Sequence, residues 1–125
     1  GNDVSSRDIE GENPLYLPQA KIYAGSCALG PCLLLADSVP DPRALSIHLL
    51  VRRRAVCFEG STSVLNMKRS FDELIAYLFR EQEFPSGVLL LTGTGIIPPD
   101  DFSLVQGDVV EITVPGIGTL RNSVA

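Results

Sequence analysis

The feature that most restricts the fold of this chain is the alternation of apolar and polar side chains in residues 46–60. Ile47, Leu49 and Val51 fall on one side of an extended backbone, and His48 falls on the other. Successive side chains of a β-strand point to opposite faces, so this pattern predicts a strand with one buried and one wet face. A chain that contains such a strand needs further strands to pair with it.

Candidates for those partners occur on both sides of the alternating segment. Further apolar or extended stretches are predicted to be strands: residues 1–4, 55–58, 88–91, 109–114 and 118–120. The arginines at 52–54 are predicted to form the tip of a hairpin, and Pro115-Gly116 is typical of a turn between strands. Residues 22–36 are apolar and interrupted by Gly30-Pro31, which predicts two extended segments. The proline-rich residues 14–18 are predicted to form an irregular flap.

One amphipathic helix is predicted to begin after Ser70. The Ser70 hydroxyl can cap the helix and Glu73 follows three residues later, which is the capping-box spacing. Apolar residues then recur at helical spacing and are predicted to pack in the core: Phe71, Leu74, Ile75, Leu78 and Phe79. Together these elements predict a single domain over residues 1–125 with a mixed α+β, mainly β fold.

Composition excludes several classes of protein. A net charge of −5 disfavours nucleic acid as a partner, because phosphate binding requires a basic surface. No apolar run approaches the length of a membrane span and no signal-peptide pattern is present, so we expect no membrane partner and a cytoplasmic location. The three cysteines lack the spacing of a zinc site and are expected to be reduced, partly buried thiols.

Two common types of active site are also disfavoured. Thr92-Gly93-Thr94-Gly95 follows a predicted strand, but Pro98 occupies the place of the third glycine of a dinucleotide-binding loop. His48 is the only histidine, and it lies in the middle of a strand beside arginines, so a Ser-His-Asp or Cys-His arrangement is disfavoured. Metal-assisted acid–base chemistry remains open.

The N-terminal residues are the best candidates for that chemistry. Four acidic residues lie in the first dozen positions: Asp3, Asp8, Glu10 and Glu12. Carboxylates are preferred ligands of hard divalent cations such as Mg²⁺. By itself, however, an acidic run of this kind is more often a solvated surface loop.

Several motifs in order resemble the C-terminal half of the fumarylacetoacetate hydrolase family. The motifs are Asn-Asp-Val-Ser-Ser-Arg-Asp-Ile-Glu at residues 2–10, Gln-Ala-Lys-Ile-Tyr at 19–23, Leu-Thr-Gly-Thr-Gly at 91–95 and Gln-Gly-Asp-Val-Val at 106–110. The resemblance covers nearly all 125 residues, and the joint order is more specific than any single motif. It implies a fumarylacetoacetase-like β-roll with one main amphipathic helix.

The resemblance also implies roles for individual residues. Asp3 matches the aspartate that binds a catalytic divalent metal, implied to be Mg²⁺, with Mn²⁺ or Ca²⁺ as alternatives. Lys21 matches the active-site lysine, and Arg7 matches the arginine of the Ser-x-Arg-Asp motif near the site, so both are candidate catalytic residues. Thr94, with Gly93 beside it, matches a substrate-contacting threonine.

The branch of the family and its completeness are further expectations. The segment at residues 12–19 and the Gly-Ile-Ile-Pro-Pro sequence at 95–99 look most like 2-keto-3-deoxy-sugar-acid dehydratases. C–C hydrolysis of acylpyruvate-type substrates and a catalytically silent scaffold that retains only dimer contacts stay open. The family's Glu-x-Glu metal ligands lie upstream of the matched aspartate, so we expect a C-terminal fragment of a homodimeric enzyme of keto-acid breakdown, inactive by itself.

Overall fold

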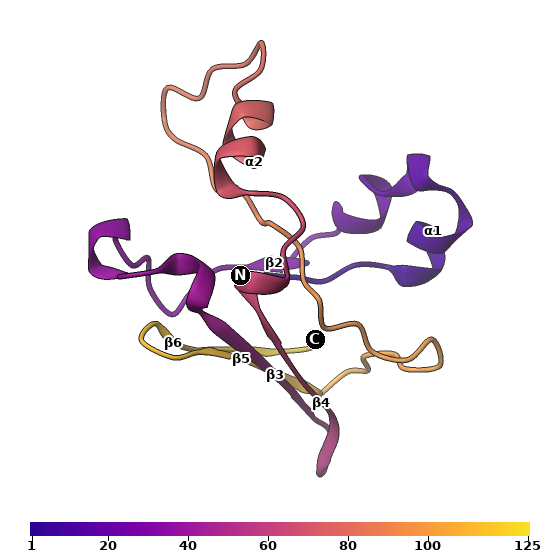
Figure 1. Ribbon diagram of the computed structural model, residues 1–125. Helices are drawn as coiled ribbons and strands as arrows, with labels where there is room; N and C mark the ends of the chain where they lie inside the picture. The colour runs from indigo at the N-terminus through magenta and orange to yellow at the C-terminus, as the bar shows by residue number, and fades with distance from the viewer.

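The computed structural model describes residues 1–125 and has a four-stranded sheet with segments that extend from it (Figure 1). We call these segments the N-terminal arm (residues 1–28), the second arm (residues 29–45) and the α2 arm (residues 64–91). The strands are β1 (Asn2–Asp3), β2 (Cys27–Ala28), β3 (Ser46–Arg52), β4 (Val56–Ser63), β5 (Val109–Val114) and β6 (Gly118–Ser123). The α-helices are α1 (Arg7–Glu12) and α2 (Phe71–Leu78). The 3₁₀ turns are η1 (Pro14–Tyr16), η2 (Gln19–Lys21), η3 (Ala36–Ser38), η4 (Pro42–Ala44) and η5 (Val64–Asn66).

The main sheet is antiparallel, in the order β4-β3-β5-β6, and it confirms the predicted alternation. Leu49 and Val51 of β3 lie opposite Ile112 and Val110 of β5, and residues opposite each other share a face. Val51 is 2% exposed and Val110 5% exposed, and Leu120 of β6 is also buried. The small core therefore lies on this face of the three strands.

The opposite face of the sheet is polar, as the alternation predicts. His48 Nε2 lies 2.9 Å from Glu59 Oε1 on the neighbouring strand β4. Glu111 accepts from Arg52 at 3.1 Å and lies 3.4 Å from Arg121 on the other side. These pairs are largely exposed, so each contributes only about 0–1 kcal/mol to the stability of the fold. Their charged groups keep this face of the sheet hydrated.

The turn between β3 and β4 carries an ion pair in which the Asp108 carboxylate is buried and the Arg53 side chain is 45% exposed. Both Asp108 carboxylate oxygens accept hydrogen bonds at 2.9 Å from the Arg53 guanidinium, and the Val105 N–H donates to the same carboxylate at 2.9 Å. Asp108 is 0% exposed. The hydrogen bonds from Arg53 and then Val105 hold the pKa of Asp108 below its ordinary value against the opposing effect of burial. The turn predicted at the tip of the hairpin is confirmed. The ion pair also holds Asp108, the residue before β5, to that turn.

Helix α2 begins where it was predicted to begin, but its apolar stripe is not part of a core. The Glu73 N–H donates to the Ser70 Oγ at 3.1 Å, which confirms the cap. No residue of α2 is buried, and Ile75 and Phe79 are each about half exposed. Figure 1 shows why, since α2 projects away from the sheet instead of packing on it. Phe79 instead packs edge-on against Phe84, with 5.4 Å between ring centroids.

Two further predictions, a strand at residues 88–91 and partly buried cysteines, were wrong. Residues 88–91 form no strand. All three cysteines are exposed rather than partly buried. Apolar runs indicate burial only where another element covers them, and residues 88–91 lie outside the main sheet. Cys57 lies in β4, the edge strand of the sheet, and is exposed there.

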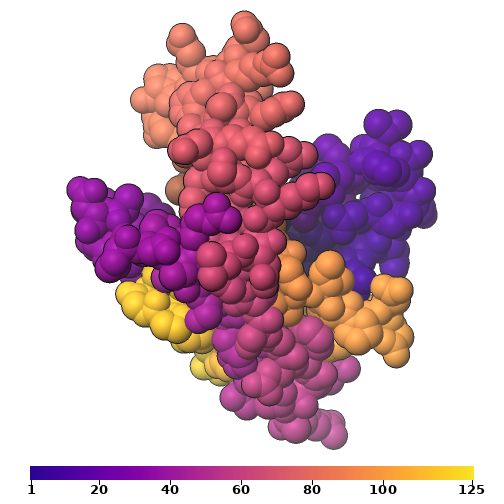
Figure 2. Space-filling view, in the orientation of Figure 1, coloured from indigo at the N-terminus to yellow at the C-terminus, as the bar shows by residue number.

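The arms leave the chain with an unusually large surface, as Figure 2 shows for the N-terminal and α2 arms. Its accessible surface is 9213 Å², whereas a folded monomer of this mass has about 6500 Å² by the usual scaling. Exposed leucines include Leu15, Leu33, Leu35, Leu65 and Leu89. None of the helices is of a length and hydrophobicity that would let it cross a bilayer.

Candidate active site

The N-terminal arm folds back on itself, so that Lys21 lies beside Asp3. The chain leaves β1, runs through α1, η1 and η2, and pairs again with β1 through β2 (Figure 1). The Ser6 N–H donates to the Ala20 carbonyl at 2.9 Å, and Ala20 is fully buried. Ala20 therefore anchors η2, and the next residue in the chain is Lys21.

Asp3 and Lys21 form an ion pair within the N-terminal arm. The Lys21 Nζ lies 3.0 Å from the Asp3 Oδ2, and each side chain is 32% exposed. The same ammonium group also donates to the Ser5 Oγ. The Ser26 hydroxyl donates to the Lys21 carbonyl at 2.8 Å, which holds the lysine backbone in place. Two residues with predicted roles are thus in direct contact.

The Asp3 carboxylate fits one position in the coordination of a hard cation. Lys21 uses Oδ2, while Oδ1 accepts no hydrogen bond, and an ionised carboxylate offers several lone pairs. Mg²⁺ usually keeps several waters and needs more than one fixed oxygen ligand for tight binding. No group of three or more His, Cys, Asp or Glu residues in the chain could hold a metal. Asp3 is therefore a suitable single ligand but not a complete site.

Arg7 lies at the start of α1 and contacts the loop that follows the Thr-Gly-Thr segment. One of its terminal nitrogens donates to the carbonyls of Pro98 and Pro99, each at 3.0 Å. The other donates to the Asp100 Oδ1 at 2.8 Å. None of these bonds reaches Asp3, so the structure places Arg7 as a link between two segments, and its catalytic role stays a prediction.

The predicted substrate-contacting loop has a defined local structure. The Thr94 Oγ1 accepts from the Ile96 N–H at 3.0 Å, and Ile96 is buried. Gly93 has a φ of 82°, in the left-handed region that favours glycine. A Cβ at Gly95 would lie only 2.8 Å from the Thr62 Oγ1, so glycine permits the loop to approach β4. Glycines therefore shape this loop by conformation at one position and by space at another.

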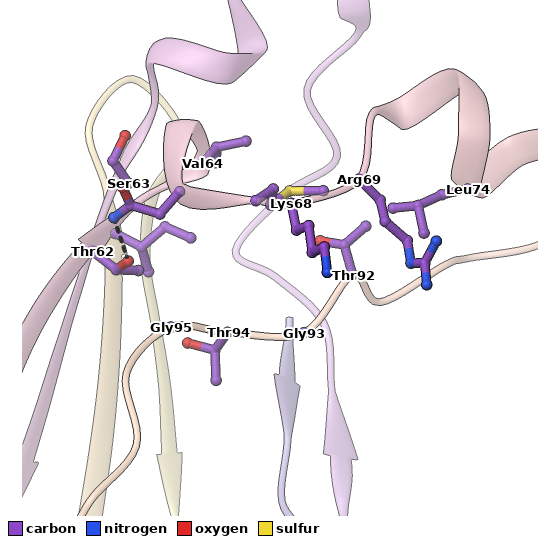
Figure 3. Close-up of a pocket in the computed structure, with 13 residues that line it drawn as sticks. Thr62, Ser63, Val64, Lys68, Arg69, Leu74, Thr92, Gly93, Thr94 and Gly95 are labelled. Atoms are coloured by element: carbon purple, nitrogen blue, oxygen red, sulfur yellow. Dashed lines mark hydrogen bonds between the residues drawn. The ribbon is translucent and has the colours of Figure 1, made fainter.

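The loop at residues 92–95 forms one wall of a pocket (Figure 3). The other walls come from the end of β4, from η5 and from the start of α2. Its lining residues include the polar Thr62, Asn66, Lys68 and Arg69, although most of the surface that lines it is apolar. Figure 3 shows the Lys68 side chain extending toward Thr92.

The pocket and the Asp3–Lys21 pair come from adjacent segments. A Cβ at Gly1 would contact the Leu91 Cδ2, so the chain entering β1 touches the residue that precedes the loop. No hydrogen bond joins Asp3 or Lys21 to Thr94. The structure thus places four of the five predicted site residues in two groups, Asp3 with Lys21 and Gly93 with Thr94. The fifth, Arg7, contacts the loop at residues 98–100 instead.

Sequence reasoning missed two members of this region. Ser5 hydrogen-bonds to Lys21, and its place in the Ser-x-Arg-Asp motif was an available signal. Lys68 is the second, because nothing local in the sequence indicates that it faces a loop 24 residues further along the chain.

The class of protein follows from this fold and site together with a match of the whole chain. Residues 1–125 match the family described as fumarylacetoacetate (FAA) hydrolase C-terminal. The chain belongs to the fumarylacetoacetate hydrolase family. Its mixed α+β, mainly β structure is that of the family's solved members, which confirms the predicted fold class.

Individual relatives are sugar-acid dehydratases. The chain is 49% identical over 125 residues to a probable 2-keto-3-deoxyxylonate dehydratase of Haloferax volcanii, covering 99% of this chain and 43% of the relative. It is 51% identical over 120 residues to 2-dehydro-3-deoxy-D-arabinonate dehydratase of Saccharolobus solfataricus, covering 95% and 40%. The chain therefore spans less than half the length of these curated relatives.

A solved structure gives the same likeness with ligands present. It is 2-keto-3-deoxy-D-arabinonate dehydratase complexed with magnesium and 2,5-dioxopentanoate, similar with a TM-score of 0.93 and 49% identity. The match covers 97% of this chain and 43% of that chain. The magnesium and the keto compound are properties of that relative.

Proposed function

We propose that the protein carrying this chain is a Mg²⁺-dependent dehydratase of 2-keto-3-deoxy sugar acids. The observation that carries the proposal is the Asp3–Lys21 pair, at 3.0 Å, in a chain about half identical to two such dehydratases. A carboxylate with a free oxygen beside a lysine ammonium group combines a cation ligand and a proton-transfer group at one place.

Each residue then has a defined task. Asp3 would supply one oxygen ligand to Mg²⁺, and the bound cation would polarise the carbonyl and carboxylate of a 2-keto acid and so acidify the carbon next to the carbonyl. Lys21, oriented by Ser5, would take the proton from that carbon as the neutral amine and return it to the departing hydroxyl group, which leaves as water. Thr94 and Gly93 contact the substrate from the neighbouring loop.

The remaining metal ligands come, in this proposal, from residues outside these 125. The reason is the number of donors, because one carboxylate does not replace enough of the Mg²⁺ water shell. Mn²⁺ and Ca²⁺ are candidate substitutes, since both also take oxygen ligands. A second, homodimeric copy fits the large surface, because apolar side chains on the arms remain uncovered in the single chain.

The experiment is a turnover assay on the full-length protein with Mg²⁺ and five- or six-carbon 2-keto-3-deoxy acids. We expect a dehydrated product, such as 2,5-dioxopentanoate from the five-carbon acid, and at least a hundred-fold loss of rate on Asp3→Ala. Asp101→Ala, an exposed acid elsewhere in the chain, is the matched control. Turnover that survives Asp3→Ala or complete chelation of divalent cations would contradict the proposal.

A C–C hydrolase is the second candidate. The observation in its favour is 31% identity over 130 residues to 2,4-didehydro-3-deoxy-L-rhamnonate hydrolase of a Sphingomonas species. Cleavage of acylpyruvates without dehydration of the 3-deoxy acids would support the hydrolase. Absence of turnover on both substrate classes would support a silent scaffold.

A further inference from the structure

We propose that Lys68 and the loop at residues 92–95 form a carboxylate subsite that positions the acid group of the substrate. This inference rests on the proposed function, because it concerns the binding of the same keto acid. The site is the pocket of Figure 3, where Lys68 reaches toward Thr92 from the segment before α2.

The first argument is the supply of unused donors. None of the backbone N–H groups of residues 92–95 donates a hydrogen bond within the chain. The loop also offers the hydroxyl groups of Thr92 and Thr94. Backbone N–H groups around a glycine in the left-handed region are well suited to an anion, because adjacent donors can converge on one oxygen.

The second argument is charge. The ammonium group of Lys68 takes part in none of the seven ion pairs of the chain. Its neighbour Arg69 lines the same pocket but is held by Glu73, with an N–O distance of 2.7 Å. The pocket therefore contains one cation that has no carboxylate partner, in a protein whose net charge is −5. An anionic ligand is attracted by such a local positive group.

The third argument is position. Leu91, which leads into the loop, touches the chain at the start of β1, and Asp3 follows two residues after that contact. A 2-keto acid is small, with its carboxylate next to the carbonyl that a cation at Asp3 would polarise. The loop of the subsite thus follows a residue that touches the chain where it enters the strand of Asp3.

The first test measures binding without turnover. Pyruvate and its neutral analogue pyruvamide are titrated by calorimetry into full-length protein at saturating Mg²⁺. We expect Lys68→Met to weaken pyruvate binding about ten-fold, the loss typical of one charge-assisted hydrogen bond at a partly exposed site, and to leave pyruvamide within about two-fold. Arg54→Met, which removes a positive charge at the exposed turn between β3 and β4, should change neither by more than about two-fold.

The second test separates positioning from catalysis. Lys68→Met should raise KM for the 3-deoxy acid about ten-fold with kcat within about two-fold, and Lys68→Arg should recover most of the loss. Unchanged KM and pyruvate binding in Lys68→Met, equal losses for pyruvate and pyruvamide, or no pyruvate binding by the wild type would each overturn the subsite. Pyruvate binding that depends on Lys68 without any dehydration would leave the subsite in place and reject the proposed function.

Discussion

Two ion pairs, each between an aspartate and a basic side chain, lie in different regions of this molecule. In the sheet, Asp108 is fully buried and receives three hydrogen bonds, two from Arg53 and one from Val105. In the N-terminal arm, Asp3 is one-third exposed and is bound through a single oxygen by Lys21.

The difference shows how one type of contact serves stability in one region and binding in another. The Asp108 carboxylate has its protein donors and no room for a ligand, so it can only hold the hairpin turn to β5. The Asp3 carboxylate keeps one oxygen free at a partly wet site, so it can bind a further group. The comparison predicts that variants of the first pair change stability and that variants of the second change activity.

The largest expected effect is that of Lys21→Ala on the chemical step. Loss of a positioned proton-transfer group typically costs 10²–10⁴-fold in kcat, so we expect at least about a hundred-fold loss. Metal affinity should be spared, because Asp3 remains. The unfolding free energy should change by no more than about 1 kcal/mol, since the pair is partly exposed. Steady-state kinetics, Mg²⁺ calorimetry and thermal unfolding of one preparation check all three, and an equal fall in metal affinity would contradict the proton-transfer role.

Asp108→Ala should have the largest effect on stability. It leaves the guanidinium of Arg53 and the N–H of Val105 without an acceptor, and such losses are costly where the site is buried. We expect the midpoint of thermal unfolding to fall by on the order of 10 °C. Below that midpoint, activity per folded molecule should be retained. Asp101→Ala is the exposed control, and equal shifts in both variants would break the comparison.

Gly60→Ala tests the contact between β4 of the sheet and the end of the substrate loop. A Cβ at Gly60 would lie 2.6 Å from the Ile96 Cγ2, and Ile96 is 7% exposed and donates its N–H to Thr94. Such overpacking costs about 1–3 kcal/mol and should also displace the substrate loop. Calorimetry and KM should therefore both change. Gly11→Ala, where a Cβ meets nothing within 4 Å, is the matched control.

Arg7→Ala should have a moderate effect on activity. It removes the hydrogen bonds to Pro98, Pro99 and Asp100 and frees α1 from the loop beyond Thr94. We expect a fall of about ten-fold in kcat/KM, equivalent to about 1.4 kcal/mol, together with faster hydrogen exchange in the 98–101 loop. A larger loss of kcat without faster exchange would favour the catalytic role that the motif implies.

The smallest expected effect is a change in the unfolding free energy at acidic pH. The pKa of Asp108 is lowered below its ordinary 3.8 in the folded chain, first by Arg53 and then by Val105. Its stabilisation is therefore complete above the ordinary pKa and is lost as the pH falls through the lowered one. As the pH falls below the ordinary pKa of 3.8, the unfolding free energy should decline more steeply in the wild type than in Asp108→Asn. Parallel curves from urea titrations would show that this carboxyl does not contribute.

The sequence alone determined those features that depend on neighbouring residues. Alternation defined β3 and its buried face, Pro115-Gly116 marked the last turn, and Ser70 capped α2, because periodicity and capping act over a few residues. Ordered motifs also led to the family, and thereby to candidate roles for Asp3, Lys21 and Thr94.

Only the tertiary structure decided which apolar runs are covered and which distant side chains meet. Residues 88–91 and the stripe of α2 are as apolar as β3, yet they lie on arms that no other element of the chain covers. Asp3 reaches Lys21, and Lys68 faces the loop at residues 92–95, across separations that no local pattern records. Burial and contact depend on long-range packing, whereas propensity and periodicity depend on the residues within a few positions.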